Sequence, residues 1–349
     1  MDKYTSIRPG QIWLDTEGKR IHAHGGSIMY VDGKYYWYGE NKEKTLPYRQ
    51  GVWHYGMKIY SSDDLYNWKD EGFVCVPEEN DPESPLNPYQ FADRPHIIYN
   101  KKDKRFVMWL KIMMSDGQRQ YMAILVSDTI TGPFKHIKSV QPLGMFSGDF
   151  DLYVEPDTEK AYIIFEKVHT ELIVADLTED YTDVTGKFTS HFPQPFPPFV
   201  REAPAFFVRN GKKYLFTSGT TGYFPNPSEV AEADDIHGPW TILGDPHVDE
   251  PGKDSYNSQI TSVFKHPFKK DLYIALADRW LIDLKPDMPN ICDIFEMWFN
   301  PDKEKYDVDV NALTAENTSL ADYVWLPVTF ENGMPVLHWY DEWKIEDFE

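Results

Sequence analysis

The sequence predicts an all-β chain that folds as a five-bladed β-propeller. Three observations support this: five copies of one hairpin pattern, a further candidate strand after each copy, and no convincing amphipathic helix between the copies. Such self-similarity is typical of repeat architectures, and three or four antiparallel strands repeated around an axis form the blades of a propeller. A multi-sheet sandwich is the alternative, but it does not explain a fivefold register.

Each copy starts with a polar residue, followed by a short apolar strand, a tight turn and a second strand rich in Tyr, Phe, Trp, Ile and Val. The turns VDGK, NKKDK, EPDTEK, RNGK and HPFKKD contain the Gly, Asn, Asp and Pro that tight reversals favour. The five predicted hairpins cover residues 24–40, 93–112, 149–166, 202–219 and 259–278.

A third candidate strand follows each hairpin. In three copies an acidic pair or Ser-Asp is followed by a turn and an aromatic residue, and the other two keep part of this pattern. The third strands are expected within residues 57–68, 122–134, 171–181, 228–240 and 293–306.

The remaining segments are assigned to loops and to the last blade. Residues 41–56 and 77–91 are rich in Pro or polar residues, so we expect rim loops that shape a pocket. Residues 305–349 contain two strand-like runs around an ENG turn, which we expect to complete the last blade together with the N-terminal strand. No linker or second module is evident, so residues 1–349 are expected to form a single propeller domain with no appended module.

Composition excludes several classes of partner. The 349 residues carry a formal net charge of −21, so nucleic acid and anionic membrane surfaces are not expected partners. The two cysteines, Cys75 and Cys292, are too few for a disulfide scaffold and are interpreted as free thiols. No apolar run suits a signal peptide or a membrane span. The expected location is cytoplasmic, or secreted or periplasmic if a signal peptide was removed from the chain.

The repeat brings polar residues to one register. In a propeller the first strand of each blade lies nearest the axis, and that register holds His24, Asp93, Asp149, Glu202 and Gln259. Like charges that share a desolvated site raise at least one pKa, so the arrangement is costly and suggests a function. Two carboxylic groups on either side of a scissile bond are what acetal hydrolysis requires. For any single residue, a turn or cap is the alternative.

These segments resemble the glycoside hydrolase family 43 propellers, and the branch with the closest resemblance is that of the galactan 1,3-β-galactosidases, or exo-β-1,3-galactanases. The resemblance extends from about Ile12 to the C-terminus. Its elements are HAHGGSI with YYWYGENK, DRPHIIYN, SGDFDLYV, REAPAFF with LFTSGTTGYFPN, SYNSQITSVF and LADRW.

The resemblance implies roles for the residues at the shared register. It implies that Glu202 is the catalytic acid, that Asp93 is a supporting carboxylate, and that Gln259 faces the anomeric carbon. In that role Gln259 needs an unusual tautomer or only holds the attacking water. The resemblance further implies that the terminal sugar is bound by Glu40, Asp149, Tyr121 and Thr220.

The chain departs from the family pattern at three positions. The first blade has His24 followed by two glycines where most members have an aspartate base, an absence that the galactanase branch shares. Asp93 stands where that branch usually has Glu, and Gly148 stands where Arg commonly precedes the aspartate. His24 is a candidate for binding the substrate, and it is otherwise expected to hydrogen-bond within the channel or to help hold a cation or water there.

Aromatic residues are further candidates for the sugar site. An aromatic ring matches the apolar face of a pyranose, and Trp280, Trp53 and Tyr223 are the candidates for this contact, with core packing as the alternative for each.

The leading functional hypothesis is an inverting, exo-acting hydrolase that releases terminal galactose from β-1,3-galactan or related oligosaccharides. No cofactor and no metal ligand is assigned, and a structural cation such as Ca²⁺ in the channel is the one addition that the polar axis allows. The alternatives are an α-L-arabinofuranosidase, β-D-galactofuranosidase or β-xylosidase on the same fold, a phosphorylase that uses Arg94, Arg201 and Arg279 as its cations, and a non-catalytic sugar-binding propeller. The sequence makes no prediction of oligomeric state.

Overall fold

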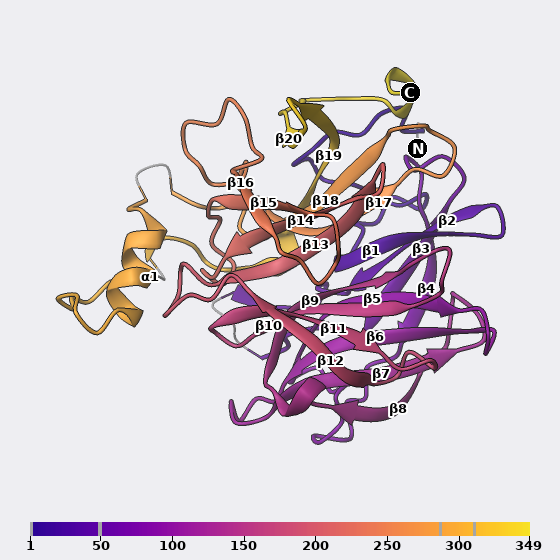
Figure 1. Ribbon diagram of the computed structural model, residues 1–349, viewed down its shortest axis with the longest axis horizontal. Helices are drawn as coiled ribbons and strands as arrows, with labels where there is room; N and C mark the ends of the chain where they lie inside the picture. The colour runs from indigo at the N-terminus through magenta and orange to yellow at the C-terminus, as the bar shows by residue number, and fades with distance from the viewer. Residues whose placement is uncertain (1–2, 48–50, 286–287, 310–311) are drawn as a thin grey trace.

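The computed structural model describes residues 3–47, 51–285, 288–309 and 312–349. They form five four-stranded antiparallel sheets, arranged as the blades of a propeller (Figure 1). The predicted fold class is therefore confirmed. In every blade the strands follow one another in chain order, and the first strand of each blade lies innermost.

The strand bounds are as follows. The first blade contains β1 His24–Val31, β2 Lys34–Glu40, β3 Met57–Ser62 and β4 Lys69–Cys75. The second contains β5 Phe91–Asn100, β6 Arg105–Met113, β7 Gln120–Ser127 and β8 Lys135–Val140. The third contains β9 Ser147–Val154, β10 Ala161–Lys167, β11 Glu171–Leu177 and β12 Val184–His191. The fourth contains β13 Arg201–Arg209, β14 Lys212–Gly219, β15 Ser228–Ala233 and β16 Thr241–Gly244. The fifth contains β17 Gln259–Lys265, β18 Tyr273–Arg279, β19 Asp322–Glu331 and β20 Met334–Leu337.

Helices are few in the described parts of the chain. They are the α-helix α1 Ile291–Phe299 and the short 3₁₀ helices η2 Pro142–Gly144, η4 Thr318–Leu320 and η5 Ile345–Asp347. Among the described residues, no helix has both the length and the apolar character that crossing a membrane requires. Cys75 and Cys292 are free thiols, as predicted.

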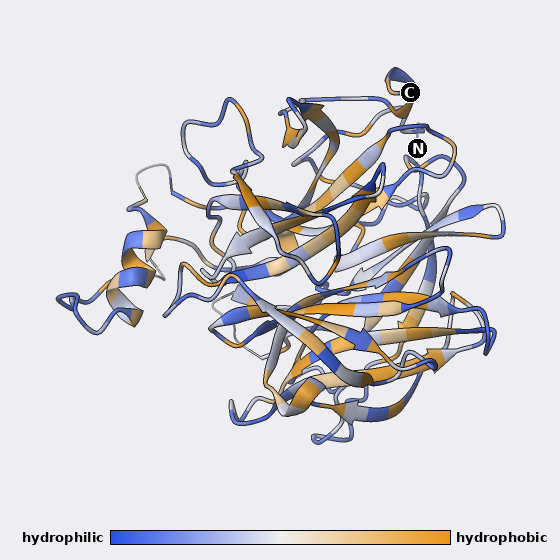
Figure 2. Cartoon of the chain, viewed as in Figure 1, coloured by the Kyte–Doolittle hydropathy of each residue, from blue (hydrophilic) through white to orange (hydrophobic). Residues whose placement is uncertain are grey.

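The middle strands are apolar on both faces because each sheet packs between two neighbours. The second strand of the second blade, RFVMWLKIM, and that of the third, AYIIFEK, are largely buried. The outermost strands KHIKSV and VTGKFTSH are mostly exposed, and their lysines discourage pairing with another chain. Figure 2 shows hydrophobic residues concentrated along the blades and hydrophilic residues in the loops.

The hydrophobic core is divided among the interfaces between neighbouring blades. Five clusters of buried side chains each join two adjacent sheets, and a sixth surrounds α1. The cluster between the first and last blades is built on Trp13, Trp37, Trp68 and Trp325, with ring centroids of Trp37 and Trp325 only 4.4 Å apart. This packing closes the ring without an exchange of strands between its two ends.

Two predictions about the last blade are wrong. Residues 293–306 do not form its third strand, because residues 291–299 form a helix that buries Ile291, Ile294 and Met297 at a spacing of three. The third and fourth strands are β19 and β20, both from the predicted C-terminal stretch. The N-terminal segment adds no strand to this sheet in the described residues, and it pairs with the C-terminal segment through an isolated bridge between Ile7 and Trp343.

We predict that Trp325→Ala destabilises the protein by about 3–5 kcal/mol, the usual cost of truncating a buried aromatic side chain. Trp325 is 1% exposed and its ring contacts three other tryptophans. The measurement is the free energy of unfolding from denaturant titration. Ile242→Ala, at a side chain that is 51% exposed, is the control and should change it by less than about 0.5 kcal/mol. Equal effects of the two substitutions would contradict the proposed role of this cluster in ring closure.

Candidate active site

The candidate active site lies at one end of the propeller axis, where the innermost strands begin and the second strands end. The five register residues lie within the first three residues of the innermost strands: His24, Asp93, Asp149, Glu202 and Gln259. Their cross-strand neighbours add a second set of polar groups: Glu40 opposite His24, Lys111 opposite Asp93, Ser218 opposite Glu202, and Asp278 opposite Gln259. The predicted convergence of chain-distant polar residues is therefore present.

Every innermost strand is irregularly paired at this level. Register shifts fall between His24 and Ser27, Asp93 and His96, Ser147 and Phe150, Glu202 and Ala205, and Ile260 and Ser262. A β-bulge re-aims side chains and is often found beside an active site. In three blades the residue directly after the register position has positive φ: Gly25 at 62°, Arg94 at 50° and Ala203 at 49°.

The glycine after His24 makes room for a carboxylate. A Cβ on Gly25 would lie 2.3 Å from Glu40 Oε1, so a side chain there would displace Glu40. That oxygen accepts a hydrogen bond of 3.0 Å from the backbone N–H of Arg94. Gly25, the first of the two glycines after His24, thus leaves the space that Glu40 occupies at the axis.

These elements surround a cavity of about 330 Å³, near the lower end of the roughly 300–1,000 Å³ usual for small-molecule sites. Its charged and amide lining includes Glu40, Asp93, Arg94, Lys111, Gln120, Asp149, Glu166, Glu202 and Gln259. Its aromatic lining includes Trp53, Phe91, Tyr223, Trp280, Phe295 and Phe299. Trp53 comes from the first predicted rim loop, and Phe91 is the last residue of the second, where β5 begins. Residues 48–50 of the first loop lie outside the described residues.

Two cations link the carboxylates across the axis. Lys111 Nζ lies 2.9 Å from Asp93 Oδ1 and 2.7 Å from Asp149 Oδ1. Arg94 Nε lies 2.8 Å from Asp149 Oδ2, and its Nη2 donates a hydrogen bond of 2.6 Å to Gln259 Oε1. Because Arg94 reaches from β5 to β9 and β17, it crosses the axis beneath the cavity.

Gln259 is held by four hydrogen bonds. Its Oε1 accepts from Arg94 Nη2 and, at 3.1 Å, from Trp280 Nε1. Its Nε2 donates to Glu202 Oε1 at 2.9 Å and to Ser218 Oγ at 3.0 Å. Arginine and indole N–H groups only donate, so Oε1 is a carbonyl oxygen, and the four bonds match the full capacity of an ordinary amide.

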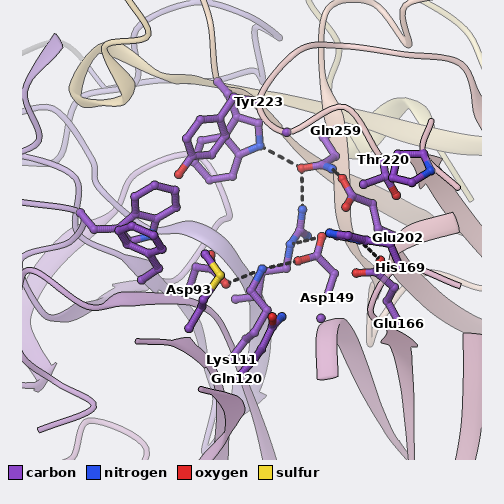
Figure 3. Close-up of a pocket in the computed structure, with 18 of the residues that line it drawn as sticks. Asp93, Lys111, Gln120, Asp149, Glu166, His169, Glu202, Thr220, Tyr223 and Gln259 are labelled. Carbon is purple, nitrogen blue, oxygen red and sulfur yellow. Dashed lines mark hydrogen bonds and ion pairs between the residues drawn. The ribbon is translucent and has the colours of Figure 1, made fainter. Parts of the chain in front are cut away.

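The carboxyl groups around this network differ in acidity. Burial, with the charges of Asp149 and Glu166, raises the pKa of Glu202 well above its usual value. Burial raises the pKa of Asp93 to about 6. The charge of Lys111 opposes this shift, and the charges of Glu40 and Asp149 add to it. For Asp149 burial is outweighed by the charges of Arg94 and Lys111, so its pKa lies below its usual value. Figure 3 shows Asp93 and Glu202 on opposite sides of Asp149.

A second ion pair supports the aromatic side of the cavity. Lys42 Nζ lies 2.8 Å from Glu40 Oε2, and both side chains are fully buried. The same ammonium group donates to the Trp53 carbonyl at 3.0 Å and lies over the rings of Trp53 and Tyr223, 4.7 and 5.8 Å from their centroids. A cation so placed is attracted by the aromatic rings and fixes their orientation.

The absence of a side chain at Gly148 leaves room for Glu166. A Cβ on Gly148 would lie 2.0 Å from Glu166 Oε2, so the glutamate occupies the space that a side chain would need. Glu166 Oε1 lies 2.6 Å from His169 Nδ1, and both residues line the cavity beside Glu202 (Figure 3). Burial disfavours the imidazolium form, but the hydrogen bond and charge of Glu166 outweigh it, so the pKa of His169 lies above its usual value.

The structure places most of the predicted site residues in the cavity wall: Glu202, Asp93, Gln259, Glu40, Asp149, Thr220 and Trp280, with Trp53 and Tyr223. Two other candidates for contact with the substrate, Tyr121 and His24, do not line the cavity. Side chains alternate along β7, so Gln120 lines the cavity and Tyr121 packs toward the core between the first two blades, its hydroxyl 3.2 Å from Met114 Sδ. His24 is fully buried, with Nδ1 2.8 Å from Asp278 Oδ1 and Nε2 3.2 Å from the Tyr323 hydroxyl.

Several lining residues were not predicted from the sequence: Lys111, Gln120, Glu166 and His169. Lys42, which supports the aromatic side of the cavity, was not predicted either. Lys111 lies opposite Asp93 in the second hairpin, so the pairing register was the signal that could have identified it. Arg94 was noted only as a cation for a phosphate site. In the part of the chain that the structure describes, no group of three or more His, Cys, Asp or Glu side chains is arranged to hold a metal ion.

We predict that Arg94→Met destabilises the protein by about 3–5 kcal/mol at neutral pH, because it leaves the buried Asp149 without one of its two cations. The pKa of Asp149 is lowered in the folded protein, so this stabilisation is present above the unfolded pKa of about 3.9 and is lost as the pH falls below it. The difference from the native protein in free energy of unfolding should shrink at acid pH. Arg209→Met is the matched control, because the Arg209–Asp271 pair is partly exposed and should contribute about 1 kcal/mol or less. A difference that does not change with pH would contradict the assignment.

Comparison with known proteins supports this picture. No curated protein sequence matches the chain significantly. A solved GH43 β-1,3-galactosidase is 31% identical to this chain, with a TM-score of 0.81. The match covers 99% of this chain and 65% of the length of that protein. A second GH43 β-1,3-galactosidase, solved with galactodeoxynojirimycin, is 29% identical with a TM-score of 0.79 over 97% of this chain and 100% of its own.

An exo-β-1,3-galactanase from Clostridium thermocellum is 27% identical with a TM-score of 0.74, over 97% of this chain and 66% of that protein. The family model described as glycosyl hydrolases family 43 matches residues 21–281, which include every register residue of the cavity. The chain therefore belongs to glycosyl hydrolase family 43.

Proposed function

We propose that the protein is an inverting, exo-acting glycosidase that releases terminal galactose from β-1,3-linked galactan or related oligosaccharides. The observation that carries the proposal is a buried carboxyl group of raised pKa, Glu202, across the cavity from a second carboxyl group, Asp93. Galactose is the proposed sugar because similar solved structures are described as β-1,3-galactosidases and an exo-β-1,3-galactanase.

The proposal of exo action rests on the closed end of the cavity. Arg94 and Asp149, which line the cavity, are paired across the axis, and Arg94 reaches on to Gln259, so this bridge blocks a polysaccharide from threading along the axis. A chain end can enter, with one sugar unit among the polar groups. Glu40, Asp149 and Thr220 line this part of the cavity and offer hydrogen-bonding groups to sugar hydroxyls.

Glu202 is proposed as the general acid. Burial and the neighbouring carboxylates raise the pKa of Glu202 well above its usual value, which favours the protonated form that donation to a leaving oxygen requires. Oε1 accepts the hydrogen bond from Gln259 Nε2, which leaves Oε2 to carry the proton.

Asp93 is proposed as the group that activates water. Gln259 already uses its full amide capacity and holds an ordinary tautomer, so it lacks a lone pair for a water proton and acts in orienting Glu202. Asp93, with a pKa of about 6, is ionised above that pH and accepts a proton from water on the side away from Glu202. Attack from that side inverts the anomeric configuration.

Hydrolysis is preferred to phosphorolysis on the basis of charge. Lys42, Arg94 and Lys111 are each paired with a carboxylate. Arg201 and Arg279, the other predicted cations, donate to the Thr217 and Tyr256 carbonyls. A phosphate dianion would have to displace these partners, whereas water needs no such exchange.

We predict that Glu202→Gln lowers kcat on β-1,3-galactobiose by about 10²–10⁴-fold, the usual contribution of general acid catalysis. The loss should be smaller on p-nitrophenyl β-galactoside, whose leaving group needs little protonation. Proton NMR of the native reaction should show α-galactose as the first-formed anomer. Glu232→Gln, on the same blade but outside the cavity lining, is the control. If β-galactose forms first, the enzyme does not invert the anomeric configuration. If the protein binds oligosaccharides tightly but turns over no galactan, arabinan or xylan, it is a sugar-binding protein and not an enzyme.

We predict a bell-shaped pH profile of kcat/KM. Activity should rise as the pH increases through about 6, where Asp93 ionises, and should fall at higher pH, where Glu202 loses its proton. Asp93→Asn should remove the rise and lower kcat/KM by about 10²–10⁴-fold. If Asp93→Asn keeps the rise while Gln259→Ala abolishes activity, then Gln259 and not Asp93 activates the water.

A further inference from the structure

The connection between β18 and β19 is the longest link between the second and third strands of any blade. In all five blades this link lies at the same end as the cavity, because the second strand ends there. The first four links span residues 41–56, 114–119, 168–170 and 220–227, and the fifth spans 280–321 and contains α1. Figure 1 shows α1 at the periphery of the molecule, outside the ring of blades.

The helix is fixed against the cavity wall. Its N-cap residue Asn290 accepts a hydrogen bond of 2.9 Å from the backbone N–H of Cys292. Ile291, Ile294 and Met297 are buried and pack in one cluster with Trp280. Trp280 also donates a hydrogen bond to Gln259, so α1 is packed directly on a residue that contacts the catalytic network.

Two aromatic residues of α1 line the cavity and are not used by the mechanism. Phe295 and Phe299 are four residues apart and therefore lie on one face of the helix, with ring centroids 6.1 Å apart and planes at 26°. Phe299 is 47% exposed, whereas Trp280 deeper in the same wall is 4% exposed. Trp280 contacts Tyr223, with ring centroids 4.9 Å apart. The aromatic lining thus runs from the buried network to solvent.

We propose that Phe295 and Phe299 bind the sugar units on the leaving-group side of the scissile bond. This inference rests on the proposed function and adds the part of the site that selects oligomers over shorter substrates. With one sugar among the polar groups of the closed cavity, the next units of the chain must leave through its mouth. Neutral galactopyranose units present an apolar C–H face that matches an aromatic ring. Because the ring of Phe299 is about half exposed, it can bind such a face with no change in the helix.

The test compares single-sugar binding with cleavage of longer chains. Phe299→Ala should lower kcat/KM on β-1,3-galactotriose by about five- to tenfold, mainly through KM, and Phe295→Ala/Phe299→Ala should lower it further. Phe299→Leu keeps apolar volume but removes the ring, and should show a similar loss to Phe299→Ala. The affinity for free galactose, measured by calorimetry, should stay within about twofold of the native value, because that sugar binds in the polar part of the cavity.

Phe188→Ala is the matched control. Phe188 lies in β12 and is 44% exposed, close to the exposure of Phe299, but it does not line the cavity, so its removal should leave kcat/KM on galactotriose unchanged. Unchanged kcat/KM in the double variant, or an equal loss in galactose affinity and in galactotriose cleavage, would overturn the inference while native turnover upholds the proposed function. If the native protein neither binds galactose nor cleaves galactotriose, the proposed function fails and this inference fails with it.

Discussion

The buried guanidinium group of Arg94 is the interaction on which the site depends. Three of the five innermost strands bring a carboxyl group to the axis, and Glu40 adds a fourth from β2. Without cations among them, their mutual repulsion would disfavour joint ionisation and raise their pKa values further. Arg94 pairs with Asp149, donates to Gln259 and, through its backbone N–H, binds Glu40, so it joins four blades directly. The hydrogen bond between Gln259 and Glu202 adds the fifth blade. One residue therefore connects the stability of the ring to the geometry of the acid.

The same network separates the roles of three carboxyl groups. Asp149 has two cationic partners and a lowered pKa, Asp93 shares one cation and has a pKa of about 6, and Glu202 receives only an amide N–H and has the most raised pKa. Burial and the number of cationic partners, more than residue type, separate the pKa values of these three groups.

Much of the fold could be predicted from the sequence because hairpin turns and strand periodicity are local. The starts of the five hairpins identified the residues at the axis, and Glu202, Asp93, Asp149 and Gln259 all lie there. The errors arose where side-chain direction depends on non-local structure. Tyr121 is one position from the lining residue Gln120, and a shift of one residue reverses the face of a strand. His24 has the right register, but Asp278 and Tyr323 from the last blade hold it outside the cavity. Helix α1 was mistaken for a strand because a short apolar run fits both periods.

Closure of the ring by packing has a consequence for the order of folding. Each blade is a continuous stretch of chain, so successive blades can associate as they leave the ribosome, each covering one face of its predecessor. The tryptophan cluster between the first and last blades is different. Trp37 can pack on Trp13 and Trp68 early, but the side that contacts Trp325 stays uncovered until β19 is made. During synthesis the nascent chain therefore carries an uncovered aromatic surface for almost its whole length, and this surface is where a chaperone would be expected to bind.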